Sequence, residues 1–183
     1  VVRKSTTAGW GFSSTQYGVP NLNYTVFGKT DGAAVELSTV ENGSGGFVIN
    51  GTSSGEEFGR VVSGAGDVNG DGFEDLIIGT SSLRDPFGLT SFVVFGKAGG
   101  SAIEASDVKL GSGGFVINGI SNNFLGGQSV SGAGDVNGDG FDDVIIGARF
   151  ADTTGGGNAG ESYVVFGQAG GFGASFELLS LNG

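Results

Sequence analysis

Short apolar runs follow one another along the chain, and Gly, Ser, Asn and Asp residues separate them. Four of these runs lie between residues 60 and 118: Arg60–Ala65, Asp75–Gly79, Ser91–Gly96 and Gly114–Asn118. They are about five or six residues long, rich in β-branched and aromatic residues, and bounded by turn residues on both sides. No stretch sustains the i, i+3, i+4 spacing of an amphipathic helix. The pattern therefore predicts an all-β chain.

Two of the runs, Leu76-Ile77-Ile78 and Val144-Ile145-Ile146, are continuously apolar. A strand with one face in water alternates apolar and polar residues, so a continuous run indicates a strand that is covered on both faces. Small sheets of four strands, each covered by its two neighbours, are the blades of a β-propeller. We therefore expect four-stranded antiparallel β-propeller blades.

The chain repeats itself with a period of sixty-eight residues. Gly43–Gly51 reappears unchanged as Gly111–Gly119, and Asp67–Asp75 reappears with one substitution as Asp135–Asp143. A repeat of this length is a supersecondary unit. We assign residues 1–56 to a partial blade that supplies outer strands, residues 57–122 to a complete blade, and residues 123–183 to a blade that lacks its outer strand. One chain thus holds an incomplete propeller.

The two Asp-rich segments have the chemistry of a calcium loop. A hard cation takes several oxygen ligands, which a tight loop supplies from alternate positions. Positions 1, 3, 5 and 9 carry a carboxylate or an amide, position 7 offers a backbone carbonyl, and position 6 is a turn-forming glycine. Each loop is expected to hold one Ca²⁺. The expected ligands are Asp67, Asn69, Asp71, Phe73 and Asp75 in the first loop, and Asp135, Asn137, Asp139, Phe141 and Asp143 in the second.

The residues at the neighbouring positions exclude one well-known kind of calcium loop. An EF-hand needs an acid at position 12 and a helix beyond it, whereas position 12 here is Ile78 or Ile146 within an apolar strand. Glu74 and Asp142, at position 8, are expected to point to solvent. An acidic hairpin turn without a metal is the alternative, although three carboxylates within nine residues repel one another when no cation is present.

The residues around the first loop resemble a known repeat. Phe58-Gly59, Val62–Gly66, the Asp-rich loop and Leu76–Gly79 together are similar to the FG-GAP repeat of integrin α-subunit propellers and their bacterial relatives. The resemblance covers nearly the whole chain. It implies a calcium-binding propeller module at the cell surface or outside the cell, with more blades than this chain supplies.

Composition argues against several functions. The formal net charge of −11 disfavours nucleic acid and anionic membrane as partners, and six of the nineteen acidic residues are expected calcium ligands. The chain has no Cys and no His, so disulfides are impossible and acid–base catalysis would fall to carboxylates or lysines. We expect no enzyme activity. No apolar run approaches the ~20 residues needed to span a bilayer, so no membrane insertion is expected.

These features predict an extracellular binding or adhesion module with a protein or glycan ligand. Two other functions stay open. The terminal blade edges could pair with another copy of the chain, which would build a ring or a filament head to tail. Alternatively, the chain could be a lectin-like or non-catalytic propeller region of a secreted hydrolase or lyase.

Overall fold

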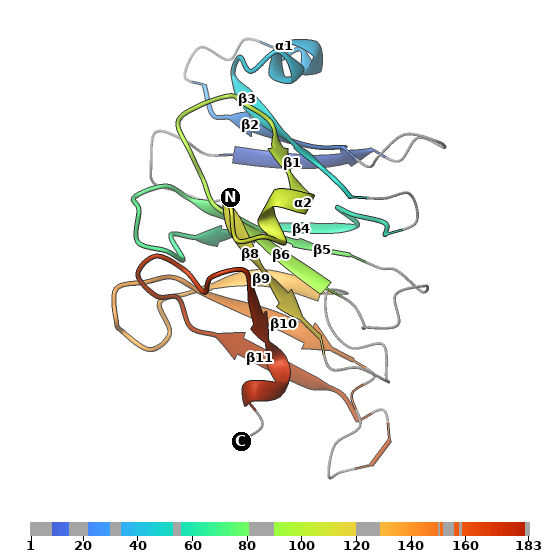
Figure 1. Ribbon diagram of the computed structural model, residues 1–183, viewed down its shortest axis with the longest axis vertical. Helices are drawn as coiled ribbons and strands as arrows, with labels where there is room; N and C mark the ends of the chain where they lie inside the picture. Colours follow the sequence, from blue (N-terminus) through green and yellow to red (C-terminus); the bar gives the residue numbers. More distant parts are fainter. Residues whose placement is uncertain are drawn as a thin grey trace.

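The computed structural model describes strands β1 to β12 in three sheets, two short α-helices and one 3-10 helix. The three sheets follow one another along the longest axis of the molecule (Figure 1). They do not close into a barrel. The prediction of an all-β, incomplete propeller-like fold is confirmed. The described residues are 9–14, 22–29, 34–52, 56–80, 90–119, 129–149, 151, 156–157 and 159–181.

The middle sheet contains the four strands that the sequence predicted, with ends that agree to within two residues. Each of these four strands is antiparallel to the others that it pairs with among the four. We call these four strands the middle blade. They are β4 (Val61–Gly66), β5 (Asp75–Gly79), β6 (Thr90–Val94) and β8 (Gly114–Asn118).

The first and last sheets follow the same plan with fewer strands. The first blade consists of β1 (Gly9–Ser14), β2 (Leu22–Phe27) and β3 (Gly46–Asn50). The last blade consists of β9 (Ser129–Gly134), β10 (Asp143–Ala148) and β11 (Glu161–Val165).

Two outer strands gain a short parallel partner from a later part of the chain. Strand β7 (Ile103–Glu104) lies beside β3, and β12 (Ser175–Glu177) lies beside β8. Both partners run directly into a helix, α2 (Ala105–Val108) and η1 (Leu178–Leu181) respectively, and the first blade carries α1 (Leu37–Glu41). These elements were not predicted, because two or three strand residues and a single helical turn are too short to show a periodic pattern.

Apolar cores fill the spaces between the blades. In β5, Ile77 belongs to the core shared with the last blade, whereas Ile78 belongs to the core shared with the first blade. Both side chains are essentially inaccessible to water. The prediction that this apolar run is covered on both faces is therefore correct.

The same prediction is wrong for the equivalent run in β10. Val144 and Ile146 are buried in the core shared with the middle blade, but Ile145 is 36% exposed. Successive side chains of a strand point to opposite faces, and no further described blade covers the outer face of the last blade.

The middle and last blades approach most closely at their first strands, β4 and β9. A Cβ atom at Gly132 would lie 2.7 Å from the carbonyl oxygen of Gly64 and 3.1 Å from the Cα of Ala65. Only a residue without a side chain fits here, so the Ser-Gly-Ala-Gly sequence of each first strand permits the close contact between the blades.

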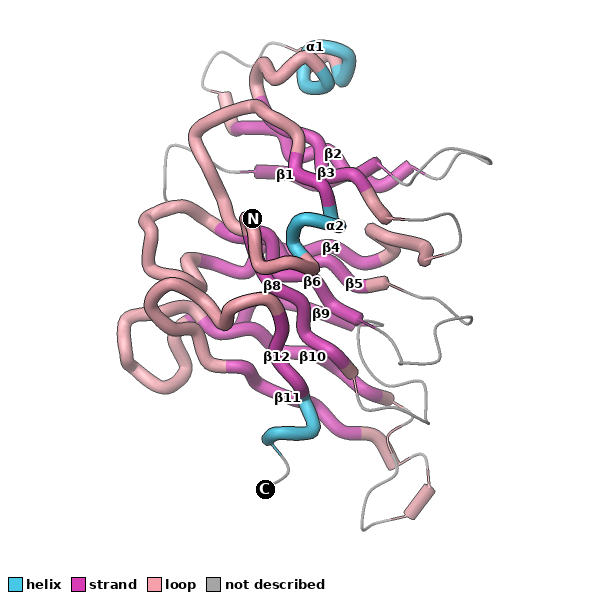
Figure 2. The backbone as a smooth tube through the Cα atoms, in the orientation of Figure 1, coloured by secondary structure: helices cyan, strands magenta, loops and turns pink. Residues whose placement is uncertain are grey.

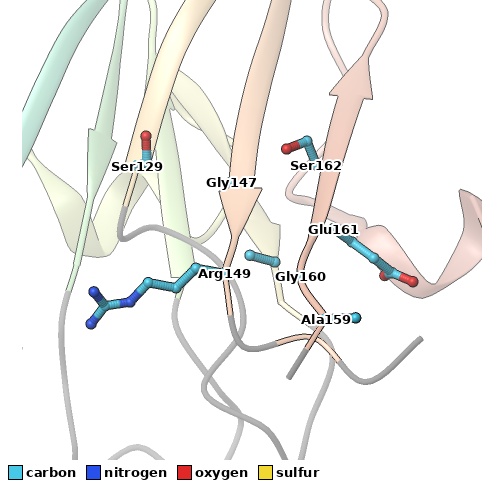
Figure 3. A pocket seen from close by; sticks show the side chains of 8 residues that line it. Ser129, Gly147, Arg149, Ala159, Gly160, Glu161 and Ser162 are labelled. Carbon is cyan, nitrogen blue, oxygen red and sulfur yellow. The ribbon is translucent and has the colours of Figure 1, made fainter. Parts of the chain in front are cut away.

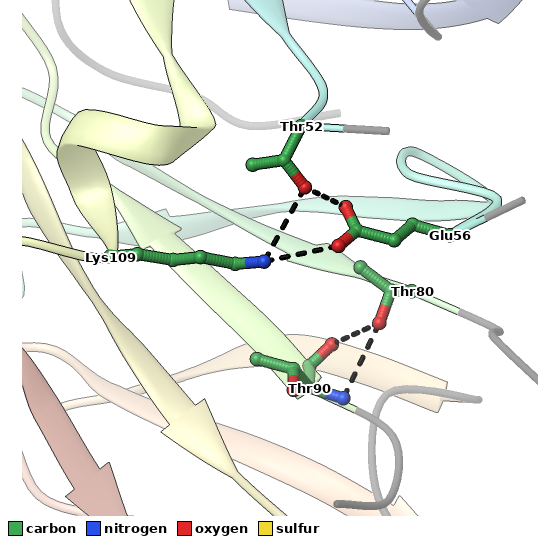
Figure 4. A network of polar contacts seen from close by, with 5 residues as sticks. All are labelled: Thr52, Glu56, Thr80, Thr90 and Lys109. Atoms are coloured by element: carbon green, nitrogen blue, oxygen red, sulfur yellow. Dashed lines mark hydrogen bonds and ion pairs between the residues drawn. The ribbon is translucent and has the colours of Figure 1, made fainter. Parts of the chain in front are cut away.

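A polar cluster ties the first blade to the middle blade (Figure 4). Lys109 follows α2, and its Nζ lies 3.0 Å from Glu56 Oε1 and 5.7 Å from the centre of the Phe92 ring. Thr52, just after β3, donates a hydrogen bond from its hydroxyl to Glu56. The cluster thus fixes the end of α2 against the segment that leaves the first blade.

Replacement of Phe115 tests the core between the middle and last blades. Its ring is fully buried, with its centroid 4.8 Å from that of Phe172, so Phe115→Ala should lower the free energy of unfolding by about 3–5 kcal/mol. Leu110→Ala is the control, because Leu110 is 79% exposed and should cost less than ~0.5 kcal/mol. Chemical denaturation measures both. Equal effects would mean that the core between these blades does not stabilise the chain.

Candidate metal centre

The two Asp-rich segments form matching loops. One joins β4 to β5 and the other joins β9 to β10, so both lie at the same end of their blades, at the left of Figures 1 and 2. Position 6 of each loop has a left-handed backbone, with φ of 89° at Gly72 and 94° at Gly140. A Cβ atom would meet no other atom at either glycine, so the backbone angle rather than space selects glycine.

In the first loop, the side chains at positions 1, 3 and 5 bend back onto the loop backbone. Asp67 accepts hydrogen bonds from the backbone N–H groups of Asp71 and Gly72, each at 2.9 Å. Asn69 Oδ1 accepts from the N–H of Asp71, and Asp71 Oδ1 accepts from the N–H of Phe73, again at 2.9 Å. These bonds gather the oxygen atoms of three side chains within one tight turn.

The second loop has the same geometry. Asp135 accepts from the N–H groups of Gly138, Asp139 and Gly140 at 2.7 to 3.0 Å. Asn137 Nδ2 donates to Asp139 Oδ2 at 2.7 Å, as Asn69 does to Asp71 in the first loop. Because the two loops share their sequence and their bonds, the local sequence sets the loop conformation.

The carboxylate at position 9 lies below each loop, within the blade. Asp75 is fully buried, and its two oxygens accept from the N–H of Val68 at 3.0 Å and from the N–H of Gly96 at 2.8 Å. Burial raises the pKa of Asp75 to about 7, against the opposing effect of these two N–H donors, and the charges of Asp71 and Asp67 raise the pKa further.

Asp143 makes the equivalent contacts in the last blade. It accepts from the N–H of Val136 and from the N–H of Gly167, both at 2.8 Å. Gly96 and Gly167 thus occupy the same place in the two repeats, and a Cβ atom at either would lie 2.4 Å from a loop carbonyl oxygen. No role was predicted for these glycines from the sequence. The Val-Phe-Gly triplet that begins at the last residue of β6 and of β11 was the available signal.

The oxygen ligands of each loop suit a hard cation, but only some of the expected ligands lie together. Carboxylate and amide oxygens are the ligands that Ca²⁺ prefers, and an ionised carboxylate has about four lone-pair sites, more than the two or three hydrogen bonds that each loop aspartate accepts. The acids at positions 1 and 5 share the loop, whereas Asp75 and Asp143 are bonded to backbone below it. Among the described residues, no group of three or more acidic, His or Cys side chains lies close enough to hold a metal ion.

Asp142, at position 8, joins the two loops instead of pointing to solvent as expected. Its Oδ2 accepts from the backbone N–H of Asp67 at 2.8 Å, and its own N–H donates to the carbonyl of Asp67 at 3.2 Å. The segment after β11 continues the contact, since the N–H of Gln168 donates to Val68 and that of Gly170 donates to Asn69. The first loop therefore rests on the last blade.

Glu74 is the equivalent residue of the first loop, and its environment differs. It is exposed and has no hydrogen-bond partner among the described residues. Loss of part of its hydration raises the pKa of the Glu74 carboxyl, and the charges of Asp142 and Asp67 raise that pKa further. The same position in the repeat thus holds a bridging acid in one loop and an unpaired acid in the other.

A second candidate site lies at the opposite end of the last blade (Figure 3). Ser129, Arg149, Glu161 and Ser162 line an open depression of about 570 Å³. Arg149 and Glu161 extend away from each other in Figure 3. The side chains therefore do not converge on a common point, and no chemistry is assigned to this depression.

Substitution of Asp142 tests the link between the loops. Asp142→Ala removes a charged acceptor from a partly buried N–H, so the free energy of unfolding should fall by about 1–3 kcal/mol. Asp142→Asn keeps an acceptor oxygen and should retain most of that stability. Glu74→Ala is the matched control at the same loop position and should cost nothing. Thermal or urea unfolding measures all three, and an equally harmless Asp142→Ala would show that the bridge does not stabilise the fold.

The comparison with known families agrees with this geometry. Two segments, residues 58–88 and 126–165, match the sequence model of the FG-GAP repeat. The first segment contains β4, its loop and β5, and the second contains β9, its loop, β10 and β11. The resemblance drawn from the sequence is thereby confirmed. The chain thus contains two FG-GAP repeats, one in the middle blade and one in the last.

Proposed function

We propose that this integrin-α-like repeat module binds one Ca²⁺ in each Asp-rich loop and serves as an extracellular binding or adhesion module. The observation that carries the proposal is the geometry that the two loops share. Each places the oxygens of two aspartates and one asparagine within a single turn, at the same end of its blade.

The ligands would be Asp67, Asn69, Asp71, the carbonyl of Phe73 and Asp75 in the first loop, and their equivalents in the second. A bound cation would neutralise the carboxylates that now face one another across the turn. It would also favour the ionised form of Asp75, whose burial opposes ionisation. Part of the negative charge of the chain would then come from carboxylates that bind metal.

The location and chemistry of the module follow from the same proposal. Millimolar calcium is typical of extracellular fluid, where modules of modest affinity are loaded. No described helix is long and apolar enough to cross a membrane. The proposed role is binding rather than catalysis, since the carboxylates that could act as acids or bases are assigned to the metal. A glycan array, run beside a screen of extracellular matrix proteins, would separate a lectin from an adhesin.

Self-assembly is the second candidate function, and the last blade favours it. Strand β11 lies at the edge of its sheet, and among the described strands it pairs only with β10. Ile145 and Phe166 of this blade are 36% and 51% exposed. An open strand edge beside apolar surface is a template for pairing with another chain. Light scattering across a concentration series tests for it, because assembly through these edges would raise the mass with concentration.

Calcium should stabilise the chain. With affinities of about 10⁻⁴–10⁻³ M per site, about 2 mM calcium should add roughly 0.7–1.8 kcal/mol per site to the free energy of unfolding. The melting temperature should rise with calcium and return to its starting value with chelator. Magnesium at the same concentration is the control for ionic strength. Absence of binding by calorimetry, with a melting temperature unaffected by chelator, would refute the calcium proposal.

The loop positions should differ in importance. Asp71→Ala and Asp139→Ala should each remove one site, so that calorimetry finds one bound Ca²⁺ per chain instead of two. Position 5 is the centre of each turn, and its oxygens bond both the backbone and the neighbouring asparagine. Glu74→Ala should leave two sites. Loss of a site in the Glu74 variant would show that the ligands are assigned to the wrong positions.

A further inference from the structure

The two Asp-rich loops share their local bonds but differ in their surroundings. Val68, at position 2 of the first loop, is fully buried, whereas Val136 at the same position of the second loop is 56% exposed. Asp67 is likewise partly buried and its counterpart Asp135 exposed. The last blade covers the first loop, and no further described blade covers the second. The two candidate calcium sites are therefore unequal in environment although their sequences are nearly the same.

One residue of the second loop holds the first ligand position of the first loop. Asp142 Oδ2 accepts from the N–H of Asp67 at 2.8 Å, and the N–H of Asp142 donates to the carbonyl of Asp67 at 3.2 Å. Both backbone polar groups of Asp67 are thus bonded to a single residue of the last blade. Among the residues that the structure describes, none from another blade bonds in this way to the backbone of Asp135.

The glycines that precede the two loops show the same inequality. A Cβ atom at Gly66 would lie 2.2 Å from Asp142 Oδ2, whereas a Cβ atom at the equivalent Gly134 would meet nothing within 4 Å. Both glycines have a left-handed backbone, with φ of 78° and 72°. The backbone angle therefore favours glycine at both positions, and Gly66 in addition leaves the space that Asp142 occupies.

The carboxylates at position 1 also differ. Asp67 accepts two hydrogen bonds from its loop, and Asp135 accepts three. An ionised carboxylate offers about four acceptor sites, so Asp67 keeps more of its oxygen lone pairs open to a cation. The first loop thus combines a ligand with a fixed backbone and a carboxylate with more open lone pairs.

We propose that Asp142 is a positioning residue for the first calcium site, so that the neighbouring blade completes this site and makes its affinity higher than that of the second. The inference rests on the proposed calcium binding. Asp142 fixes the backbone of Asp67 before the cation arrives, and binding then costs less conformational freedom. Asp142 acts through Asp67 and is not itself a ligand.

A calcium titration followed by NMR tests the proposal, because amide signals report each loop separately. The N–H of Gly72 donates to Asp67 at 2.9 Å, and that of Gly140 donates to Asp135 at 3.0 Å, so each signal senses a cation in its own loop. In the unsubstituted chain, Gly72 should reach its midpoint at a lower calcium concentration than Gly140. Equal midpoints, or the reverse order, would overturn the proposal.

Substitution of Asp142 should affect the loop to which it does not belong. Asp142→Ala should raise the midpoint of Gly72 about tenfold and that of Gly140 by less than about threefold. Asp142→Asn keeps an acceptor oxygen and should stay close to the unsubstituted chain at both signals, and Glu74→Ala is the control at the same loop position. A larger effect of Asp142→Ala on Gly140 would overturn the proposal, as would an equal loss with Asp142→Asn, which would assign the effect to charge.

A second pair of variants keeps the test independent of the stability of Asp142→Ala. Gly66→Ala and Gly134→Ala put a Cβ atom on the same left-handed backbone, so their strain is matched, but only Gly66→Ala pushes against Asp142. Gly66→Ala should therefore weaken the first site more than Gly134→Ala weakens the second, and equal losses would overturn the proposal.

Failure of this inference differs from failure of the calcium proposal. If neither Gly72 nor Gly140 responds to calcium in the unsubstituted chain, calcium binding itself is refuted, and the role of Asp142 is refuted with it. If both signals respond but Asp142→Ala leaves the midpoint of Gly72 unchanged, calcium binding stands and the positioning role alone is overturned.

Discussion

The fold depends on the burial of both faces of each blade. A strand such as β5 points Ile77 toward one neighbouring blade and Ile78 toward the other, and neither side chain is accessible to water. At about 25 cal/mol per Å² of apolar surface, this burial is the largest favourable contribution that such small sheets can make. A single blade has no interior of its own, because its two faces become a core only when other blades cover them. The repeat in the sequence is therefore a requirement of stability as well as a record of duplication.

Hydrogen bonds then fix how one blade sits on the next. At one end, Asp142 accepts from Asp67, and the segment after β11 donates to the first Asp-rich loop. At the outer edge, Asn50 and Asn118 donate to glutamates that arrive from the following repeat. The apolar cores are not directional, so these polar contacts determine the register between blades. The candidate metal loops belong to this set of contacts, which links any ligand bound there to the packing of two blades.

The sequence predicted the strands of the middle blade and the loops with good accuracy, because their signals are local. Apolar runs bounded by glycine mark β4, β5, β6 and β8, and the spacing of Asp67, Asn69 and Asp71 fixes a turn whose bonds close within six residues. What the sequence did not reveal involves residues far apart. Asp142 contacts Asp67 across 75 positions, and Glu104 contacts Asn50 across 54. Position 8 looks like a solvent-facing residue within its own loop, and only the neighbouring blade gives it a partner. The exposure of Ile145 has the same origin. An isoleucine at this position shows that the strand belongs to the repeat, but it does not show whether a neighbouring blade covers the side chain.

The hydrogen bonds of Asn50 with Glu104 and of Asn118 with Glu177 each join two consecutive repeats. The structural unit therefore extends beyond the boundary of the sequence repeat. The acid that closes an outer strand is encoded in the repeat that follows, together with the loop and strands of a different blade. Duplication or recombination of whole repeats therefore carries each glutamate to a new neighbour, while the asparagine it must meet stays with the preceding repeat. An exchanged repeat would keep this contact only where the preceding repeat supplies an asparagine and the following repeat supplies a glutamate. The same hydrogen bond between Asn and Glu joins both pairs of consecutive repeats, and the other residues of each blade can differ without changing it.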